Sequence, residues 1–202
     1  MQFPDFFAQV PRLRLQDPLA DFLGASSGGV LEYGYEDAVK LAGHSCPTVA
    51  SAYALGCKAL GALYPDGLPE RGGVRVELAE GRDEGVTGVI ASVLSLLTGA
   101  AQEGGFKGIG GNFGRRNLLH FAAPIPLSLR VVRLDSGAAV DGEADLSRVP
   151  AVPEMSLLLG RCLGGEADAG ERQRFAALWQ ERVERILCRH WDDERVFLVR
   201  PV

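Results

Sequence analysis

The sequence predicts an α+β domain in which a mixed β-sheet packs against helices, with two more helices near its C-terminal end. Apolar residues recur every three or four positions over residues 47–63 and 86–97, which is the period of helices with a buried face. Residues 74–78 alternate apolar and charged side chains, which is the period of a strand with one wet face. Both kinds of element are therefore expected in one folding unit.

The N-terminal elements are bounded by residues that start and stop helices. Asp17 as N-cap and Pro18 at the first helical position predict a short helix. A second helix is expected over residues 35–41, closed by Gly43, and a third from Pro47 to about residue 63. The apolar stripe of this third helix is expected to consist of Val49, Tyr53, Cys57, Leu60 and Leu63.

The second half of the chain combines strands and helices around a glycine-rich segment. Six glycines within residues 104–114 exclude regular structure there. Strands are predicted over residues 117–122, 127–134 and 138–145, and we expect these three to form a meander. Helices are predicted over residues 154–163 and 171–187, followed by a last strand over 196–199.

Length and composition predict one folding unit over residues 1–202, with a core over about 35–145 and a helical extension over about 150–190. The chain is 47% hydrophobic and 23% charged, close to globular averages, which argues against a disordered or fibrous protein. A net charge of −5 and a pI near 5.3 argue against nucleic acid or an anionic membrane as a partner. Small molecules or metal ions are the expected ligands.

The sequence favours a cytoplasmic location. The apolar run over residues 86–97 is well short of the roughly 20 residues that span a bilayer. Residues 1–9 lack the basic and apolar regions of a signal peptide. The four cysteines form no CxxC pair and no regular spacing, so reduced thiols are expected rather than a disulfide framework.

Residues 43–47, Gly-His-Ser-Cys-Pro, carry the clearest chemical signal. His44 offers a neutral imidazole and Cys46 a thiolate, which are both good ligands for a borderline-soft divalent ion. The loop precedes a helix N-terminus, where free N–H groups and the helix dipole favour a thiolate. That environment suits metal binding and nucleophilic chemistry equally. The alternative is that His44 is an ordinary loop histidine and Cys46 a small buried residue.

Three sequence elements in order carry a family resemblance: Ala-Gly-His-Ser-Cys-Pro at 42–47, Glu-Gly-Arg-Asp-Glu-Gly-Val at 80–86 and Phe-Gly-Arg-Arg-Asn-Leu at 113–118. Over about residues 35–135 the chain resembles the FmdE family, which takes its name from one component of molybdenum or tungsten formylmethanofuran dehydrogenase. The resemblance implies a mixed sheet like that of the glyceraldehyde-phosphate dehydrogenase catalytic domain. It also implies a metal bound through His44 and Cys46, and a homodimer.

The sequence departs from the family pattern at two places. Family members typically have a cysteine and then an aspartate in the strand-to-helix turn, where this chain has Glu84 and Thr87. Many members also carry a C-terminal zinc finger, which is absent here, so the chain resembles a divergent member. For the missing ligands we expect Glu84 first and Asp83 second, from an acidic turn that also contains Glu80, with His120 as a further candidate. The alternatives are solvated turn charges and a structural histidine.

Other candidate residues have a weaker signal. Cys188 and His190 repeat the Cys-x-His pattern at the frayed end of the last predicted helix, but residues 191–193 beside them read as an ordinary polar turn. Cys57 and Cys162 are expected to be packing residues. The glycine-rich segment, with Lys107, Arg115 and Arg116 close by, is either an anion-binding loop or a flexible connection, and nothing in it indicates a nucleotide fold.

Three functional hypotheses follow. The first is a metal-binding protein of undefined reaction, with zinc or another transition metal such as Ni²⁺ in an open site. The second is a thiol-dependent enzyme with Cys46 as nucleophile, assisted by His44 or Asp83. The third is an accessory or scaffold protein whose C-terminal helices, with Trp179 and Trp191, dock a partner or a second copy. Metal content, thiol reactivity and oligomeric mass distinguish the three.

Overall fold

The computed structural model describes residues 2–202 and confirms the predicted α+β class with a mixed sheet. The main sheet has five strands in the order β4-β3-β5-β6-β7. β4 runs parallel to β3, and every other neighbouring pair is antiparallel. The strands are β3 (Val74–Leu78), β4 (Leu119–His120), β5 (Leu129–Arg133), β6 (Ala139–Ala144) and β7 (Phe197–Pro201).

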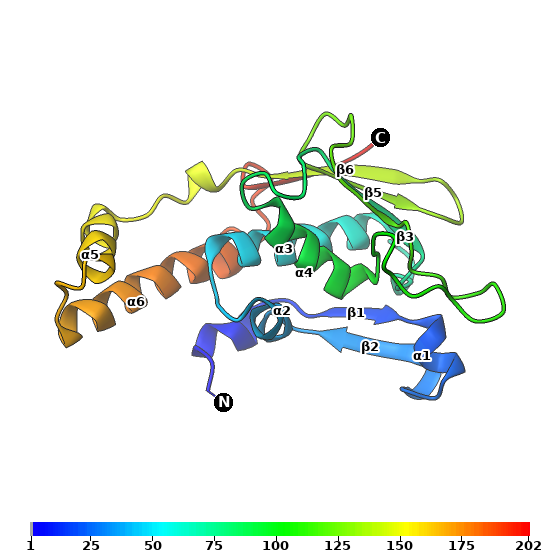
Figure 1. The fold of residues 1–202 in the computed structure, drawn as a ribbon, viewed down its shortest axis with the longest axis horizontal. Coiled ribbons are helices and arrows are strands. Elements are labelled where there is room, and N and C mark those ends of the chain that lie inside the picture. The colour runs from blue at the N-terminus through cyan, green and yellow to red at the C-terminus, as the bar shows by residue number, and fades with distance from the viewer. Residues whose placement is uncertain (1) are drawn as a thin grey trace.

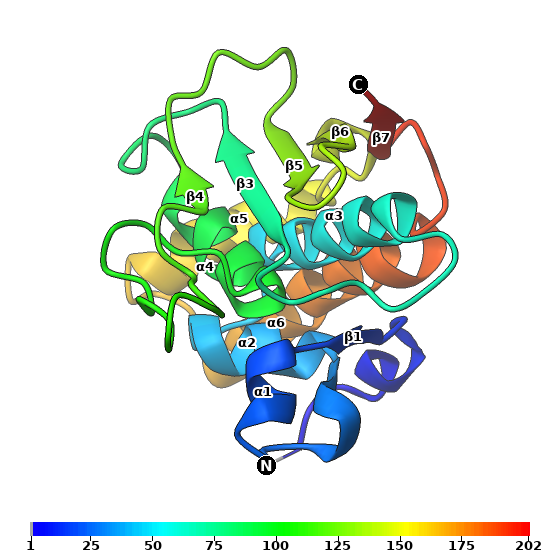
Figure 2. The same ribbon diagram turned by 90° about the vertical axis from the view of Figure 1, so that its right-hand side faces the viewer.

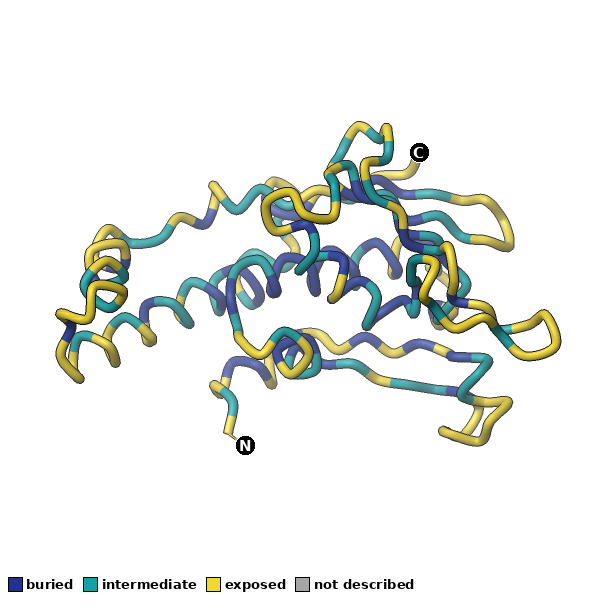
Figure 3. Tube along the Cα trace, in the orientation of Figure 1, coloured by how far each residue is buried: buried dark blue, intermediate teal, exposed yellow. Residues whose placement is uncertain are grey.

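Two helices form a layer against one face of this sheet, α3 (Pro47–Leu63) and α4 (Thr87–Thr98) (Figures 1 and 2). Both helices and β3 were predicted from their apolar periods. Val74, Val76 and Leu78 of β3 are buried, as the alternation predicts. The predicted apolar stripe of α3 is buried apart from the half-buried Cys57. Residues outside that stripe are buried too, because α3 lies between two layers (Figure 3).

The layer on the other side of α3 is built from the N-terminal segment (Figure 1). It contains a two-stranded antiparallel sheet and α2 (Tyr35–Ala42). Tyr53 of α3 donates its hydroxyl to Pro11 O at 2.8 Å and Tyr33 O at 3.0 Å, which fastens the two layers together. The other elements here are 3-10 helix η1 (Asp5–Gln9), β1 (Leu13–Gln16), α1 (Pro18–Phe22), 3-10 helix η2 (Ser27–Gly29) and β2 (Val30–Tyr33).

A buried ion cluster joins the start of the chain to the glycine-rich segment. Asp17, which is only 4% exposed, caps α1 as predicted and also contacts two arginines. Its Oδ1 is 2.6 Å from Arg115 Nη2, and its Oδ2 is 3.0 Å from Arg71 Nη1. Gly72 is required here, because a Cβ at that position would overlap the Arg115 guanidinium. The cluster therefore connects segments almost a hundred residues apart in sequence.

The C-terminal segment forms a projecting arm of two helices, α5 (Pro153–Leu163) and α6 (Ala169–Glu184) (Figure 1). The arm follows the 3-10 helix η3 (Leu146–Arg148), and a π-helical turn η4 (Arg185–Arg189) leads back to β7. Met155, Leu158 and Leu178 form a small cluster of their own between the two helices. Beyond that cluster the arm is mostly exposed or half-buried (Figure 3). The C-terminal end of α6 approaches α3.

The predicted meander is wrong at its first strand. β5 and β6 pair as expected, but β3 lies between β4 and β5. β4 is parallel to β3 because α4 and the glycine-rich segment form the long crossover that parallel pairing needs. β4 is also only two residues long, since Asn117 and Ala122 on either side adopt positive φ angles.

Candidate functional site

The Gly43–Cys46 segment, here called the metal loop after the metal that the sequence predicts for it, is a short connection between α2 and α3. Gly43 ends α2 in the left-handed conformation with φ 77°, and Pro47 begins α3, both as predicted. Cys46 is the N-cap of α3, and its Sγ accepts a hydrogen bond from Val49 N at 3.4 Å. The residue is 9% exposed. The predicted placement of the thiol at a helix N-terminus is therefore confirmed.

His44 is exposed and held by one ring nitrogen. Its Nδ1 lies 2.9 Å from Ala42 O. Because a carbonyl oxygen only accepts, Nδ1 carries the hydrogen and Nε2 keeps its lone pair in the neutral ring. His44 lines a hollow of about 270 Å³, here called the His44 hollow. Its other lining residues are Leu41, Ala42, Gly88, Val89, Ser92 and Val93.

Ser45, between the two candidate ligands, is held from both sides. Trp179 Nε1 donates to Ser45 O at 2.9 Å, and Gln180 Nε2 donates to the same oxygen at 3.3 Å. Ser45 Oγ donates to Gln180 Oε1 at 2.9 Å and accepts from the Tyr35 hydroxyl at 3.0 Å. Burial raises the pKa of Tyr35 above its ordinary value, so the phenol remains a donor. The metal loop is thus fixed by α2 and α6 together.

The predicted carboxylate ligands Glu84 and Asp83 belong to the 80–84 turn, between β3 and α4. Glu84 is exposed, and its Oε2 accepts from Gly81 N at 2.6 Å within its own turn. Asp83 is exposed at the tip of that turn. Glu80 is the carboxylate of this turn that lines a cavity, and its Oε2 accepts from Thr87 Oγ1 at 2.6 Å. The β3 alternation could have indicated this, because Glu80 follows Leu78 by two residues on the helix-facing side.

The cavity beside Glu80, here called the Glu80 hollow, measures about 290 Å³ and lies at the end of the sheet. The first residues of α4 contribute to both hollows, since Thr87 lines the Glu80 hollow and Gly88 lines the His44 hollow. The wall is mainly apolar. Among its lining residues are Thr48, Ser51, Ala52, Leu55, Leu78, Ile90, Ser128 and Leu129.

His120 is exposed on β4, and its Nε2 lies 3.0 Å from Asn117 O. Across residues 2–202, no three His, Cys, Asp or Glu side chains lie close enough together to hold one metal ion. The five predicted ligands, His44, Cys46, Glu84, Asp83 and His120, are therefore not gathered in one place. What the fold does provide is His44 and Cys46 on a single fixed loop.

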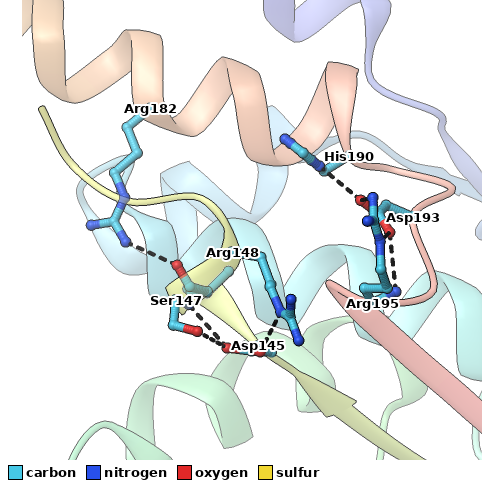
Figure 4. Close-up of polar contacts among 8 residues, drawn as sticks. Asp145, Ser147, Arg148, Arg182, His190, Asp193 and Arg195 are labelled. Atoms are coloured by element: carbon cyan, nitrogen blue, oxygen red, sulfur yellow. Dashed lines mark hydrogen bonds and ion pairs between the residues drawn. The ribbon is translucent and has the colours of Figure 1, made fainter.

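Cys188 lies in the π-helical turn η4 and packs against the core, whereas His190 follows η4 and begins a local polar turn (Figure 4). His190 Nδ1 lies 3.2 Å from Asp193 Oδ2, and Arg195 contacts the same carboxylate. Hydrogen bonds from Arg195 and His190 lower the pKa of Asp193. Cys57 lies against the core, and burial raises the pKa of its thiol to about 12, which suits the predicted packing role.

The glycine-rich segment is irregular, as predicted. One of its three nearby cations, Arg115, turns into the buried cluster with Asp17. Its Nη1 has no hydrogen-bond partner among the described residues. Anion binding by this segment stays a prediction that now depends on Lys107 and Arg116, which are exposed.

No protein-family model matches the chain, and no curated protein matches it. None of the helices within residues 2–202 has the length and apolar character needed to cross a membrane. The residues of the metal loop and their surroundings are therefore the basis for a functional proposal.

Proposed function

We propose that the metal loop binds a transition metal, zinc first and Ni²⁺ second, in an FmdE-like cytoplasmic protein of undefined reaction. The supporting observation is the hydrogen bond from His44 Nδ1 to Ala42 O. Metal-binding histidines almost always donate their second ring N–H in this way, which fixes the tautomer and directs the other nitrogen toward the metal. We also propose that the mixed sheet resembles that of the glyceraldehyde-phosphate dehydrogenase catalytic domain.

The donor types fit zinc, and their number defines the kind of site. Imidazole nitrogen and thiolate sulfur are usual zinc ligands, and the Val49 N–H group supports negative charge on Cys46 Sγ. A structural zinc site uses four protein ligands, so two from one loop describe an open site. Zinc held there would supply a Lewis acid and lower the pKa of a bound water. The other positions belong to water, a substrate or a second copy of the chain.

His44→Ala should weaken zinc binding far more than His120→Ala. The two histidines are matched, because each is exposed and each has one ring nitrogen on a nearby backbone carbonyl. Loss of a direct ligand should exceed the roughly 10–100-fold cost of losing a supporting hydrogen-bond partner. Competition against a chelator, with protein purified without a histidine tag, measures both affinities. Equal weakening in the two variants would remove His44 from the site.

The thiol-enzyme hypothesis has one observation in its favour, which is the position of Cys46 at the helix N-terminus with Val49 N–H on its sulfur. The two functions are separated by alkylation with iodoacetamide. If Cys46 is a metal ligand, stoichiometric zinc should protect it from alkylation, and a chelator should restore the reaction by removing the zinc. A nucleophilic Cys46 reacts rapidly in protein that contains no metal, and added zinc leaves that rate unchanged.

We also propose a homodimer formed across the exposed side of α4. The His44 hollow adjoins a second apolar hollow of about 480 Å³, and Leu41, Gly88 and Ser92 line both. Leu41 is 49% exposed. The expected mass by light scattering at micromolar concentration is that of two chains, and Ser92→Glu should halve it by placing a charge in the centre of the surface. Ser136→Glu, in the exposed β5–β6 turn, is the control. A monomeric wild-type mass would end this proposal.

A further inference from the structure

The C-terminal arm makes its polar contact with the metal loop at one residue, Ser45. Two donors from adjacent α6 positions, Trp179 and Gln180, converge on Ser45 O, and Gln180 also accepts from Ser45 Oγ. These residues are more than 130 positions apart in sequence. Neither the FmdE-like motifs nor the predicted ligands include α6.

The geometry of this contact bears directly on the two candidate ligands. Ser45 O belongs to the peptide unit that joins Ser45 to Cys46, and a peptide unit is planar. Two N–H donors on that oxygen fix the plane, and the plane places Cys46 N and Cα, from which the Cys46 side chain leaves the backbone. His44 is fixed from the other side by Ala42 O. The relative placement of the two side chains thus depends on α6.

We propose that Trp179 and Gln180 are positioning residues for the metal loop, so that metal binding and the docking of α6 are coupled. The inference rests on the proposed function, because it concerns the same site. Coupling of this kind is reciprocal: zinc that requires one loop conformation favours the docked helix, and a displaced helix weakens zinc. Loss of such a supporting hydrogen-bond partner typically costs about 10–100-fold in metal affinity.

The C-terminal arm projects from the body of the protein (Figure 1), so a movement of the arm could reach the metal loop through α6. α5 and α6 pack on each other through Met155, Leu158 and Leu178, which form a cluster separate from the main core. Leu157 and Leu163 of α5 are 68% and 80% exposed. Nearer the body, Arg182 of α6 donates to Val149 O at 2.8 Å. Displacement of the arm would therefore be transmitted along α6 to Trp179, one helical turn before Arg182.

The chain contains two tryptophans, which allows a direct spectroscopic test. In the Trp191→Phe protein, Trp179 is the sole indole, and its emission should change during a zinc titration and saturate at the bound stoichiometry. In the Trp179→Phe protein, Trp191 is the reporter. Trp191 packs near Tyr53 and Lys58, and the ring centroids of Trp191 and Tyr53 are 6.4 Å apart. The emission of Trp191 should stay constant during the zinc titration. A contact that only stabilises the fold would not make Trp179 respond to zinc.

Affinity supplies the second readout. Trp179→Phe keeps an aromatic ring and removes the indole N–H, and Gln180→Ala removes the paired contact. Each should weaken zinc binding by about 10–100-fold. Gln173→Ala, at an exposed position of the same helix, should leave the zinc affinity unchanged. Circular dichroism of the metal-free proteins separates loss of affinity from loss of fold.

The outcomes distinguish the inference from the proposed function. If zinc binds wild type, Trp179→Phe and Gln180→Ala with equal affinity and the emission of Trp179 stays constant, the positioning role is overturned. The proposal that the metal loop binds zinc is then unaffected. A wild-type protein that binds no zinc overturns both. A weakened variant together with a zinc-dependent Trp179 signal supports the coupling, including when Trp179→Phe also lowers the melting temperature.

Discussion

Asp17→Ala is expected to lower the free energy of unfolding by about 3–5 kcal/mol, because breaking one member of a buried ion cluster leaves its partners uncompensated. The Arg115 side chain is 7% exposed, and its Nη2 is 2.6 Å from Asp17 Oδ1. The same carboxylate accepts from Leu19 N at 2.9 Å and Ala20 N at 3.2 Å, so the substitution also removes the N-cap of α1. Loss of a cap alone typically costs about 1 kcal/mol.

Denaturant unfolding of wild type, Asp17→Ala, Asp17→Asn and Asp21→Ala measures the effect. Asp21 is exposed on the same short helix, and its replacement should change stability by less than about 0.5 kcal/mol. Asp17→Asn keeps an oxygen for the cap and removes the charge, so it isolates the ionic part. A loss below about 1 kcal/mol for Asp17→Ala would show that the cluster is dispensable.

The same cluster predicts an acid-sensitive contribution. Burial raises the pKa of Asp17, but the Arg71 hydrogen bond and the charge of Arg115 outweigh it, so the pKa falls below its ordinary value of 3.8. The unfolded chain therefore binds the proton more readily than the folded chain. The stabilisation that ionised Asp17 contributes is fully present when the pH is above 3.8, the ordinary pKa. It is lost as the pH falls through the lowered pKa of Asp17 in the folded protein. The difference in free energy of unfolding between wild type and Asp17→Asn should therefore decrease in that pH range. A difference that stays constant with pH would contradict this.

The sequence predicted those elements whose signal is local. Asp17 and Pro18 at the start of α1, Gly43 at the end of α2 and Pro47 at the start of α3 all act on the adjacent backbone, and the structure places them as expected. The apolar period of α4 also sufficed, although α4 starts at Thr87. Such signals are readable because capping and helical periodicity involve residues at most a few positions apart.

Pairing between distant segments was not predictable in the same way. Leu13 and Leu15 of β1 alternate with exposed residues, but four residues are too few to identify a strand whose partner begins at Val30. β4 paired with β3 rather than β5 because the intervening helix supplies a crossover, a signal that was present in the predicted order of elements.

The residues of the candidate site also differ in whether a local sequence pattern could predict their placement. His44 and Cys46 were found because two residues on one loop are necessarily near each other. Glu84, Asp83 and His120 required a long-range placement that no local pattern fixes, and the chain does not gather them with the loop. The contacts of Trp179 and Gln180 with Ser45 carried no sequence signal, since a helix face that reaches a backbone carbonyl looks like any polar and aromatic face.

Cys46→Ala is expected to remove most of the bound metal, because it deletes the thiolate of the loop. Cys57→Ala is the matched control, since Cys57 lies on the helix that Cys46 caps and burial holds its thiol protonated. Thiolate, rather than thiol, is the form that binds metal. Elemental analysis of both variants after identical zinc loading and gel filtration gives the comparison. Cys57→Ala should retain the wild-type zinc content.

X-ray absorption at the zinc edge of the loaded wild-type protein tests the His44–Cys46 site most directly. The expected spectrum contains one sulfur scatterer at about 2.3 Å and at least one imidazole nitrogen at about 2.0–2.1 Å. The sulfur contribution should vanish in any zinc that Cys46→Ala retains and persist in Cys57→Ala. A wild-type spectrum with only oxygen and nitrogen neighbours would contradict binding through Cys46 and reassign the metal to carboxylates such as those of the 80–84 turn.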